Sequence, residues 1–136
     1  MSDEETVGVL YNTCYGGFNM SRKAVELINK KYQEIGKQPI NSYDYVSRTD
    51  PVILEVYEQL GSDNFSGINS KIHIEYIKKR YINFIKIDEY DGMESVIIDY
   101  SSSVITQIDK ILNSTQTDSE KLSNIQYELN NIFKDI

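Results

Sequence analysis

The pattern of apolar and polar residues divides the first hundred residues into strand-like and helix-like segments. Residues 6–12 (TVGVLYN) form a short apolar run rich in β-branched side chains, which predicts a buried strand. Residues 22–35 and 51–60 carry apolar side chains at helical spacing, which predicts two amphipathic helices. Three further strand-like runs follow, at 71–77, 83–90 and 94–100. The predicted order of elements is therefore β-α-α-β-β-β.

Residues that favour helix ends and tight turns support these boundaries. Ser21 and Gly36 are expected to bound the first helix, and Asp50 and Gly61 the second. The pair Asp91-Gly92 separates the last two strand-like runs and predicts a two-residue hairpin turn. We therefore expect an α+β fold, with helices packed on one face of a small, mainly antiparallel sheet.

The last third of the chain has a different character, because glycine and proline are absent after Ser101. Two stripes of apolar residues at helical spacing, separated by the polar segment 113–119, predict a helical hairpin. The stripes comprise Val104, Ile105, Ile108, Ile111 and Leu112, and then Leu122, Ile125, Leu129, Ile132 and Ile136. We expect residues 1–100 to form a single α+β domain and residues 101–136 a C-terminal helical extension. Two interpretations stay open: the hairpin closes the core of its own domain, or residues 104–136 bind a second copy or another protein.

Composition narrows the class of protein. The chain has 136 residues, which suits one domain of ordinary size, and 40% of them are hydrophobic. Its net charge of −7 argues against nucleic-acid binding and against an anionic membrane surface. No apolar run approaches the ~20 residues of a membrane span, and a single cysteine suits a reducing compartment. We expect an intracellular protein. The basic island Lys78–Arg80 is either a solvated loop or a contact for a small anion, and its role stays open.

Residues 11–21 (YNTCYGGFNMS), here called the glycine loop, join the first strand to the first helix. Unpaired backbone N–H groups at a helix start attract anions, and glycine lets a ligand approach the backbone closely. The loop has neither the P-loop pattern nor the dinucleotide-binding pattern. Ten residues are candidates for binding a small anionic ligand: Tyr11, Asn12, Thr13, Cys14, Tyr15, Gly16, Gly17, Phe18, Ser21 and, from before the second helix, Arg48. The alternative is a tight turn whose aromatic side chains pack inside.

Catalysis by Cys14 would need a base. The only histidine is His73, in a predicted strand, and a buried small apolar role suits Cys14 better. No residue is therefore identified as catalytic, and any cofactor stays unknown.

The predicted hairpin at residues 88–94 is crowded with acidic side chains. A two-residue turn at Asp91-Gly92 would place Glu89 opposite Glu94, where like charges destabilise the pair. Three arrangements would relieve this repulsion. The side chains could point into water, they could form an ion pair with Arg48 or Arg22, or Glu89, Asp91 and Glu94 could bind a metal ion.

Three blocks of sequence carry a resemblance to a known family. They are YNTCYGGF, R-x-DP-x-x-x-x-V-x-E-x-LG and EYDG-x-E-S-V, all within residues 7–98. In that order they resemble an uncharacterised family of small proteins from bacteriophages and large DNA viruses. The resemblance implies a viral context, with the host cytoplasm or the virion as the location, and it implies no settled activity. The segment KKRYIN and the tail after Ser101 depart from the family pattern.

Three functional hypotheses follow, and we favour a binding protein over an enzyme. The first is a viral module that binds, and in doing so sequesters, a small ligand such as a nucleotide at the glycine loop. The second is a protein–protein interaction factor that docks on a host or viral partner, or dimerises, through the C-terminal helices. The third is a small hydrolase that uses the acidic hairpin 88–94.

Overall fold

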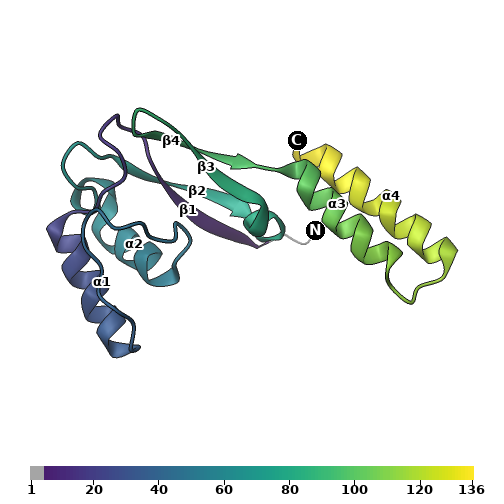
Figure 1. Ribbon diagram of the computed structural model, residues 1–136, viewed down its shortest axis with the longest axis horizontal. Coiled ribbons are helices and arrows are strands. Elements are labelled where there is room, and N and C mark those ends of the chain that lie inside the picture. Colours follow the sequence, from purple (N-terminus) through teal and green to yellow (C-terminus); the bar gives the residue numbers. More distant parts are fainter. Residues whose placement is uncertain (1–4) are drawn as a thin grey trace. The chain divides into compact units, whose positions relative to one another are not determined.

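The structure is a computed structural model that describes residues 5–136, and the predicted α+β class is confirmed (Figure 1). The chain forms two compact units. The first unit comprises the chain up to Lys79 together with Ile87–Ile97, and the second comprises Arg80–Lys86 together with Ile98–Ile136. The predicted division placed residues 80–86 with the first hundred residues, whereas they cluster with the C-terminal helices.

The strands form two antiparallel pairs rather than the single small sheet that we expected. Strand β1 (Thr6–Asn12) pairs with β2 (Ile72–Lys78), and β3 (Ile85–Tyr90) forms a hairpin with β4 (Met93–Ile98). The hydrogen bonds at the outer edge of β1 explain why the β3–β4 pair does not join the β1–β2 pair in one sheet. The backbone N–H of Leu10 donates to the carbonyl of Arg48 at 2.9 Å, and the N–H of Asn12 donates to the Glu94 carboxylate at 2.8 Å. With these donors engaged elsewhere, β1 has no backbone ladder with β4.

The hairpin turn at Asp91-Gly92 is confirmed. Both residues have positive φ angles, 49° and 88°, as a tight two-residue hairpin turn requires. The predicted strands 83–90 and 94–100 are shorter than expected. A 3-10 helix, η1 (Lys79–Phe84), precedes β3, and a helix begins immediately after Asp99.

The helices of the first unit begin at the predicted caps. Helix α1 (Arg22–Glu34) starts after Ser21, whose hydroxyl oxygen accepts a hydrogen bond from the Ala24 N–H at 3.1 Å. Helix α2 (Pro51–Phe65) starts after Asp50, whose carboxylate accepts from the Val52 N–H at 2.9 Å. Each cap satisfies a backbone donor that the helix leaves unpaired.

Gly61 interrupts α2 but does not end it, which corrects the predicted boundary. Its φ of 77° breaks the helical path, and one more turn continues to Phe65, beyond the predicted end of the helix. Phe65 is fully buried, and the Ser62 hydroxyl donates to the Ile72 carbonyl at 2.6 Å. Burial of the phenylalanine and anchoring of the serine hold this extra turn against β2.

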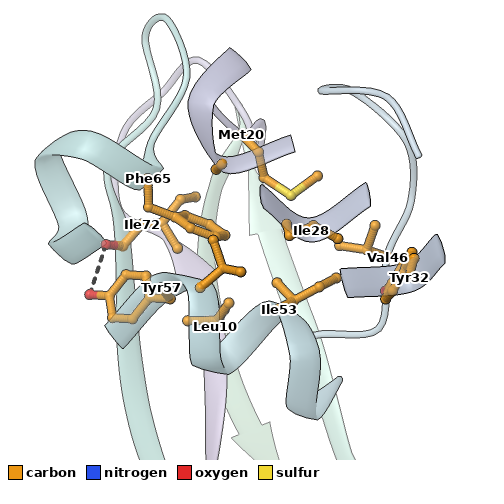
Figure 2. Close-up of a cluster of buried hydrophobic side chains, with 11 residues drawn as sticks. Leu10, Met20, Ile28, Tyr32, Val46, Ile53, Tyr57, Phe65 and Ile72 are labelled. Carbon is orange, nitrogen blue, oxygen red and sulfur yellow. Dashed lines mark hydrogen bonds between the residues drawn. The ribbon is translucent and has the colours of Figure 1, made fainter. Parts of the chain in front are cut away.

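The core of the first unit lies between the two helices and the β1–β2 pair (Figure 2). Phe65 and Tyr57 pack edge to face with ring centroids 5.3 Å apart, and the Tyr57 hydroxyl donates to the Ile72 carbonyl. The buried members of the core are Leu10, Met20, Ala24, Ile28, Tyr32, Val46, Ile53, Val56, Tyr57, Phe65 and Ile72. They come from every element of the first unit except the hairpin, which is held to the rest by polar contacts described below.

The second unit contains the predicted helical hairpin, α3 (Tyr100–Leu112) and α4 (Asp118–Asp135), which pack against each other (Figure 1). A reciprocal capping box between Thr117 and Glu120 starts α4. From η1, Tyr81 packs edge to face on Tyr100 at 5.0 Å, and its hydroxyl donates to Asp135. These contacts tie η1 to both helices.

Candidate functional site

Asn12 is the organising residue of the glycine loop. It is fully buried at the end of β1, and its amide nitrogen donates to the carbonyls of Cys14 (2.6 Å) and Gly92 (2.8 Å). Its amide oxygen accepts from the Cys14 N–H, the Ser70 hydroxyl and the Lys71 N–H. Both amide protons are therefore used, and the oxygen has three donors around it. This predicted ligand-binding residue joins three chain segments to one another.

The glycines of the loop allow backbones to approach each other closely. A Cβ on Gly16 would lie 1.9 Å from the carbonyl oxygen of Asn69. A Cβ on Gly92, in the hairpin turn, would lie 2.4 Å from the carbonyl oxygen of Tyr15 and 2.5 Å from the N–H nitrogen of Gly17. Gly17 itself has a φ of 85° and open space where a Cβ would stand. The hairpin tip therefore lies directly on the glycine loop.

Asn19 is a second buried amide that our sequence analysis did not identify. Its side chain donates to the Ile68 carbonyl at 3.0 Å, and its backbone carbonyl accepts from the Gly67 N–H at 3.0 Å. A Cβ on Gly67 would lie 1.7 Å from the Asn19 amide oxygen. Asn19 holds the far end of the glycine loop to residues 67–68 as Asn12 holds the near end. Asn12 is nine residues before the helix cap Ser21 and Asn19 is two residues before it, and neither spacing is a recognisable signal.

Arg48 lies against the glycine loop, but its charge is matched inside the protein. Its guanidinium carbon is 3.7 Å from the centre of the Phe18 ring, and its two terminal nitrogens donate to both oxygens of Glu94 at 2.5 and 2.8 Å. The side chains of Arg48 and Glu94 are only 12% and 7% exposed. Of the three arrangements considered for the acidic hairpin, Glu94 has the ion pair with Arg48. The Nε atom of Arg48 is buried and has no hydrogen-bond partner within the described residues.

Glu89 of the acidic hairpin also has an internal role. The Glu89 carboxylate accepts a hydrogen bond from the Gly92 N–H, which closes the turn. Within residues 5–136 no cluster of three or more histidine, cysteine or acidic side chains is arranged to hold a metal ion.

Of the remaining candidates in the glycine loop, some have partners within the protein and one, Tyr15, is exposed. The Thr13 hydroxyl donates to the Lys71 carbonyl, and the Ser21 hydroxyl donates to the Asn64 carbonyl while it caps α1. Tyr11 lies beside the His73 ring, with centroids 6.3 Å apart. Tyr15, in contrast, is 66% exposed. It borders a shallow, open hollow of about 400 Å³, which is lined by Cys14, Tyr15, Gly16 and Asn69.

A second candidate surface lies on the helical hairpin. Six large apolar side chains there are 54–75% exposed: Ile105, Leu112, Leu122, Tyr127, Phe133 and Ile136. At 3.6 residues per turn, Ile105 and Leu112 lie within about 20° of each other around α3, and so do Leu122 and Phe133 around α4. Tyr127 lies about 140° from Leu122, on another side of α4. The sequence stripes included four of these residues but missed Phe133, which the eleven-residue spacing from Leu122 places on the same side.

The exposed apolar edges of the two helices lie on the same side of the hairpin. On α3, the half-buried Val104 and Ile111 mark the packed side of the helix. Ile105 and Leu112 come one residue later and are therefore rotated from that side by about 100° around the helix axis. On α4, Leu122 and Phe133 follow the buried Ile132 by about 80–100° in the same sense. The helices run antiparallel, so equal rotations in the same sense bring both edges to one side. Ile136 follows α4, with its N–H bonded to the Ile132 carbonyl, and lies about 40° beyond Ile132 in the same sense. We call Ile105, Leu112, Leu122, Phe133 and Ile136 the hairpin face.

No helix within the described residues is long and apolar enough to cross a membrane. No protein-family model, curated protein or solved structure matches this chain. The resemblance to viral proteins therefore stays a prediction, and the geometry of the two candidate surfaces is what bears on function.

Proposed function

We propose that this protein is an interaction module that binds a protein partner through the helical hairpin. The observation that carries the proposal is the hairpin face, where five large apolar side chains from both helices lie on one side and are exposed. Scattered apolar residues on a surface are ordinary, but several large ones gathered on one side of a helical hairpin are typical of a binding surface. The resemblance to bacteriophage and large DNA virus proteins supplies the setting: an infected cell, with a host or viral protein as partner, in the host cytoplasm or the virion.

The contacts of the glycine loop favour this proposal over a ligand site there. The polar side chains that were candidates for ligand binding, above all Asn12 and Arg48, have protein partners. A ligand that used them would first have to break buried hydrogen bonds, which is costly. The hairpin face makes no such demand, because its side chains lose only water on binding.

A photocrosslinking amino acid placed on the hairpin face tests the proposal. The full chain carries the crosslinker in place of Leu122, which is 70% exposed. A control carries it in place of Tyr127, which is 62% exposed and lies on another side of α4. In the native cellular setting we expect covalent adducts to protein, whether another protein or a second copy, from position 122 and few from position 127. The absence of protein adducts at position 122, or equal yields from both positions, would overturn the proposal.

A second candidate function is binding of a small anionic ligand, such as a nucleotide, at the glycine loop. It is supported by the hollow beside Cys14, Gly16 and Asn69, where the exposed Tyr15 ring could stack on a base. Native mass spectrometry of gently purified protein is the test. An excess mass that disappears on denaturation, and that is reduced in Tyr15→Ala but retained in the control Tyr43→Ala, would support it. A bare protein mass in both the wild type and the control would count against it.

A further inference from the structure

We infer that the partner of the hairpin face is a second copy of this chain, so that two helical hairpins pack into a four-helix bundle with two-fold symmetry. This inference rests on the proposed function and names its partner. In such an interface the same patch of each copy contacts the other, so the patch must complement itself. Four observations favour a second copy over an unlike protein.

The first observation is the small core of the second unit. Among residues 80–86 and 98–136, all of which the structure describes, three side chains are buried: Tyr81, Ser103 and Ile132. Chains this short rarely bury enough apolar surface alone and usually need disulfides, metals or oligomerisation. The only cysteine, Cys14, is in the first unit, and the described residues hold no metal-binding cluster. Association is therefore the remaining way for the second unit to bury more apolar surface. A second copy is a partner that is present wherever the protein is made.

The second observation is the shape of the apolar pattern. A stable helix bundle needs each helix to contact two neighbours through a stripe wider than a single seam. In α4 the apolar side chains extend from the buried Ile132 through the half-buried Leu129 to the exposed Leu122 and Phe133. One edge of the stripe is used within the hairpin and the other is open. Two such hairpins placed face to face give each helix its second neighbour.

The third observation is the charge around the hairpin face. On the open side of this face, α4 has the uncharged Ser119, Ser123, Gln126 and Asn130 and the basic Lys134, and α3 has the acidic Asp109. The second unit as a whole has five basic and six acidic side chains, so two copies repel each other little. The face therefore selects neither an acidic nor a basic partner. A second copy presents the same apolar stripe and the same border, with one acidic and one basic side chain.

The fourth observation is area. At 54–75% exposure, the five side chains of the hairpin face present on the order of 600 Å² of apolar surface. This is most of the roughly 800 Å² that each partner contributes to an interface of standard size. The half-buried Ile108 and Leu129 border the same face and would add to it. The area is sufficient for a specific dimer.

Sedimentation velocity of the purified full chain, from about 1 to 100 µM, tests the inference. We expect a species of twice the 15.7 kDa subunit mass. Leu122→Ser combined with Phe133→Ser should weaken association at least tenfold, whereas the control Tyr127→Ser should leave it unchanged. All three substituted positions are exposed, and circular dichroism of each variant checks that the helices still form.

The outcomes separate this inference from the proposed function. A chain that is monomeric over the whole range, but that crosslinks to a different protein in cells from position 122, overturns the second copy and leaves the proposed function standing. A monomeric chain with no protein adducts overturns both. A dimer that the double variant forms with unchanged affinity overturns the hairpin face as the interface.

Discussion

At the scale of single residues, the Arg48–Glu94 ion pair is the main polar link between the β3–β4 hairpin and the rest of the first unit. Both charges are largely buried, the contact is bidentate, and Glu94 also accepts the N–H of Asn12. Removing one member of a buried ion pair leaves the other charge without compensation, which costs more than the pair contributed. The effect of a substitution here should therefore be much larger than at an exposed ion pair.

We predict that Glu94→Gln lowers the free energy of unfolding by about 3 kcal/mol, because Arg48 stays buried without a matching charge. The control is Glu55→Gln, which removes an exposed ion pair with Lys31 and should cost at most about 1 kcal/mol. Urea unfolding followed by near-ultraviolet circular dichroism measures both. Equal effects of the two substitutions would show that burial of the Arg48–Glu94 pair has no energetic consequence.

Asp50 combines its capping role with a small cluster of charge and hydrogen bonds. Its carboxylate accepts from the Tyr32 hydroxyl at 2.6 Å and from the Lys37 ammonium at 2.9 Å. Burial by itself would raise the pKa of Asp50, but the hydrogen bonds from Tyr32, Lys37 and Val52 outweigh burial and lower the pKa below its ordinary 3.8. The ionised form is therefore the form that the fold stabilises.

This lowered pKa predicts the direction of acid destabilisation. The unfolded chain takes up a proton on Asp50 before the folded chain does, so the stabilisation is present above about pH 4 and is lost as pH falls through the lowered folded pKa. We expect the stability difference between wild type and Asp50→Asn to be constant near neutral pH and to shrink below about pH 4. Urea midpoints measured from pH 7 to pH 2.5 test this. A difference that persists unchanged at the lowest pH would contradict it.

At the scale of elements, the contact of the hairpin tip with the glycine loop decides the shape of this end of the first unit. Gly92 and Gly17 both have positive φ angles, yet only Gly92 would bring a new side chain against backbone. Both positions therefore favour glycine because of their positive φ angles, but only Gly92 also needs it because another backbone lies where a Cβ would stand.

We predict that Gly92→Ala destabilises the protein by about 1–3 kcal/mol more than Gly17→Ala does. Both substitutions carry the conformational cost of a positive φ, about 1–2 kcal/mol, and Gly92→Ala adds overpacking against Tyr15 and Gly17. Thermal or urea unfolding of the two variants gives the difference directly. Equal destabilisation would mean that the hairpin tip moves away at little cost.

The elements that the sequence predicted well are those with local causes. The caps at Ser21 and Asp50 and the turn at Asp91-Gly92 depend on side chains and backbone preferences within a few residues. The extra turn of α2 after Gly61 was missed because its cause is the burial of Phe65 against distant segments. The two separate strand pairs were missed because distant residues occupy the edge of β1, through the backbone carbonyl of Arg48 and the side chain of Glu94.

The candidate site shows the same division between local and distant causes. The glycine loop was located correctly as a strand-to-helix connection. Apart from Cys14, however, the partners of the Asn12 side chain are 58 to 80 residues away, and no spacing rule predicts them. Glu94 and Arg48 were predicted as one of three alternatives, and only the tertiary structure brings them together. The apolar edges of the C-terminal helices follow from helical periodicity, and the sequence stripes contained every member of the hairpin face except Phe133.

At the scale of the whole molecule, the second unit has the smaller share of buried side chains, and its stability should depend on association. A ligand or partner that binds only the folded state raises apparent stability with its concentration, and for a dimer that partner is the protein itself.

We therefore predict that the midpoint of thermal unfolding, followed by the helical circular dichroism signal, rises with protein concentration in the wild type. In Leu122→Ser combined with Phe133→Ser the midpoint should be lower and independent of concentration, while Tyr127→Ser should behave as the wild type. Melting curves over a hundredfold range of concentration test this. A wild-type midpoint that stays constant over that range would contradict a stabilising dimer.

The first unit is discontinuous in sequence, and this bears on how the protein is made on the ribosome. Its strand pair, two helices and core are complete by Lys79, yet the groups that close the glycine loop, Gly92 and Glu94, are synthesised afterwards, beyond the segment Arg80–Lys86 that belongs to the second unit. Until that hairpin leaves the ribosomal exit tunnel, the nascent chain holds Arg48 without its carboxylate partner and Asn12 without one of its acceptors. The glycine loop of the growing chain should therefore be accessible to proteases and chaperones, and it should become protected within the synthesis of a few residues.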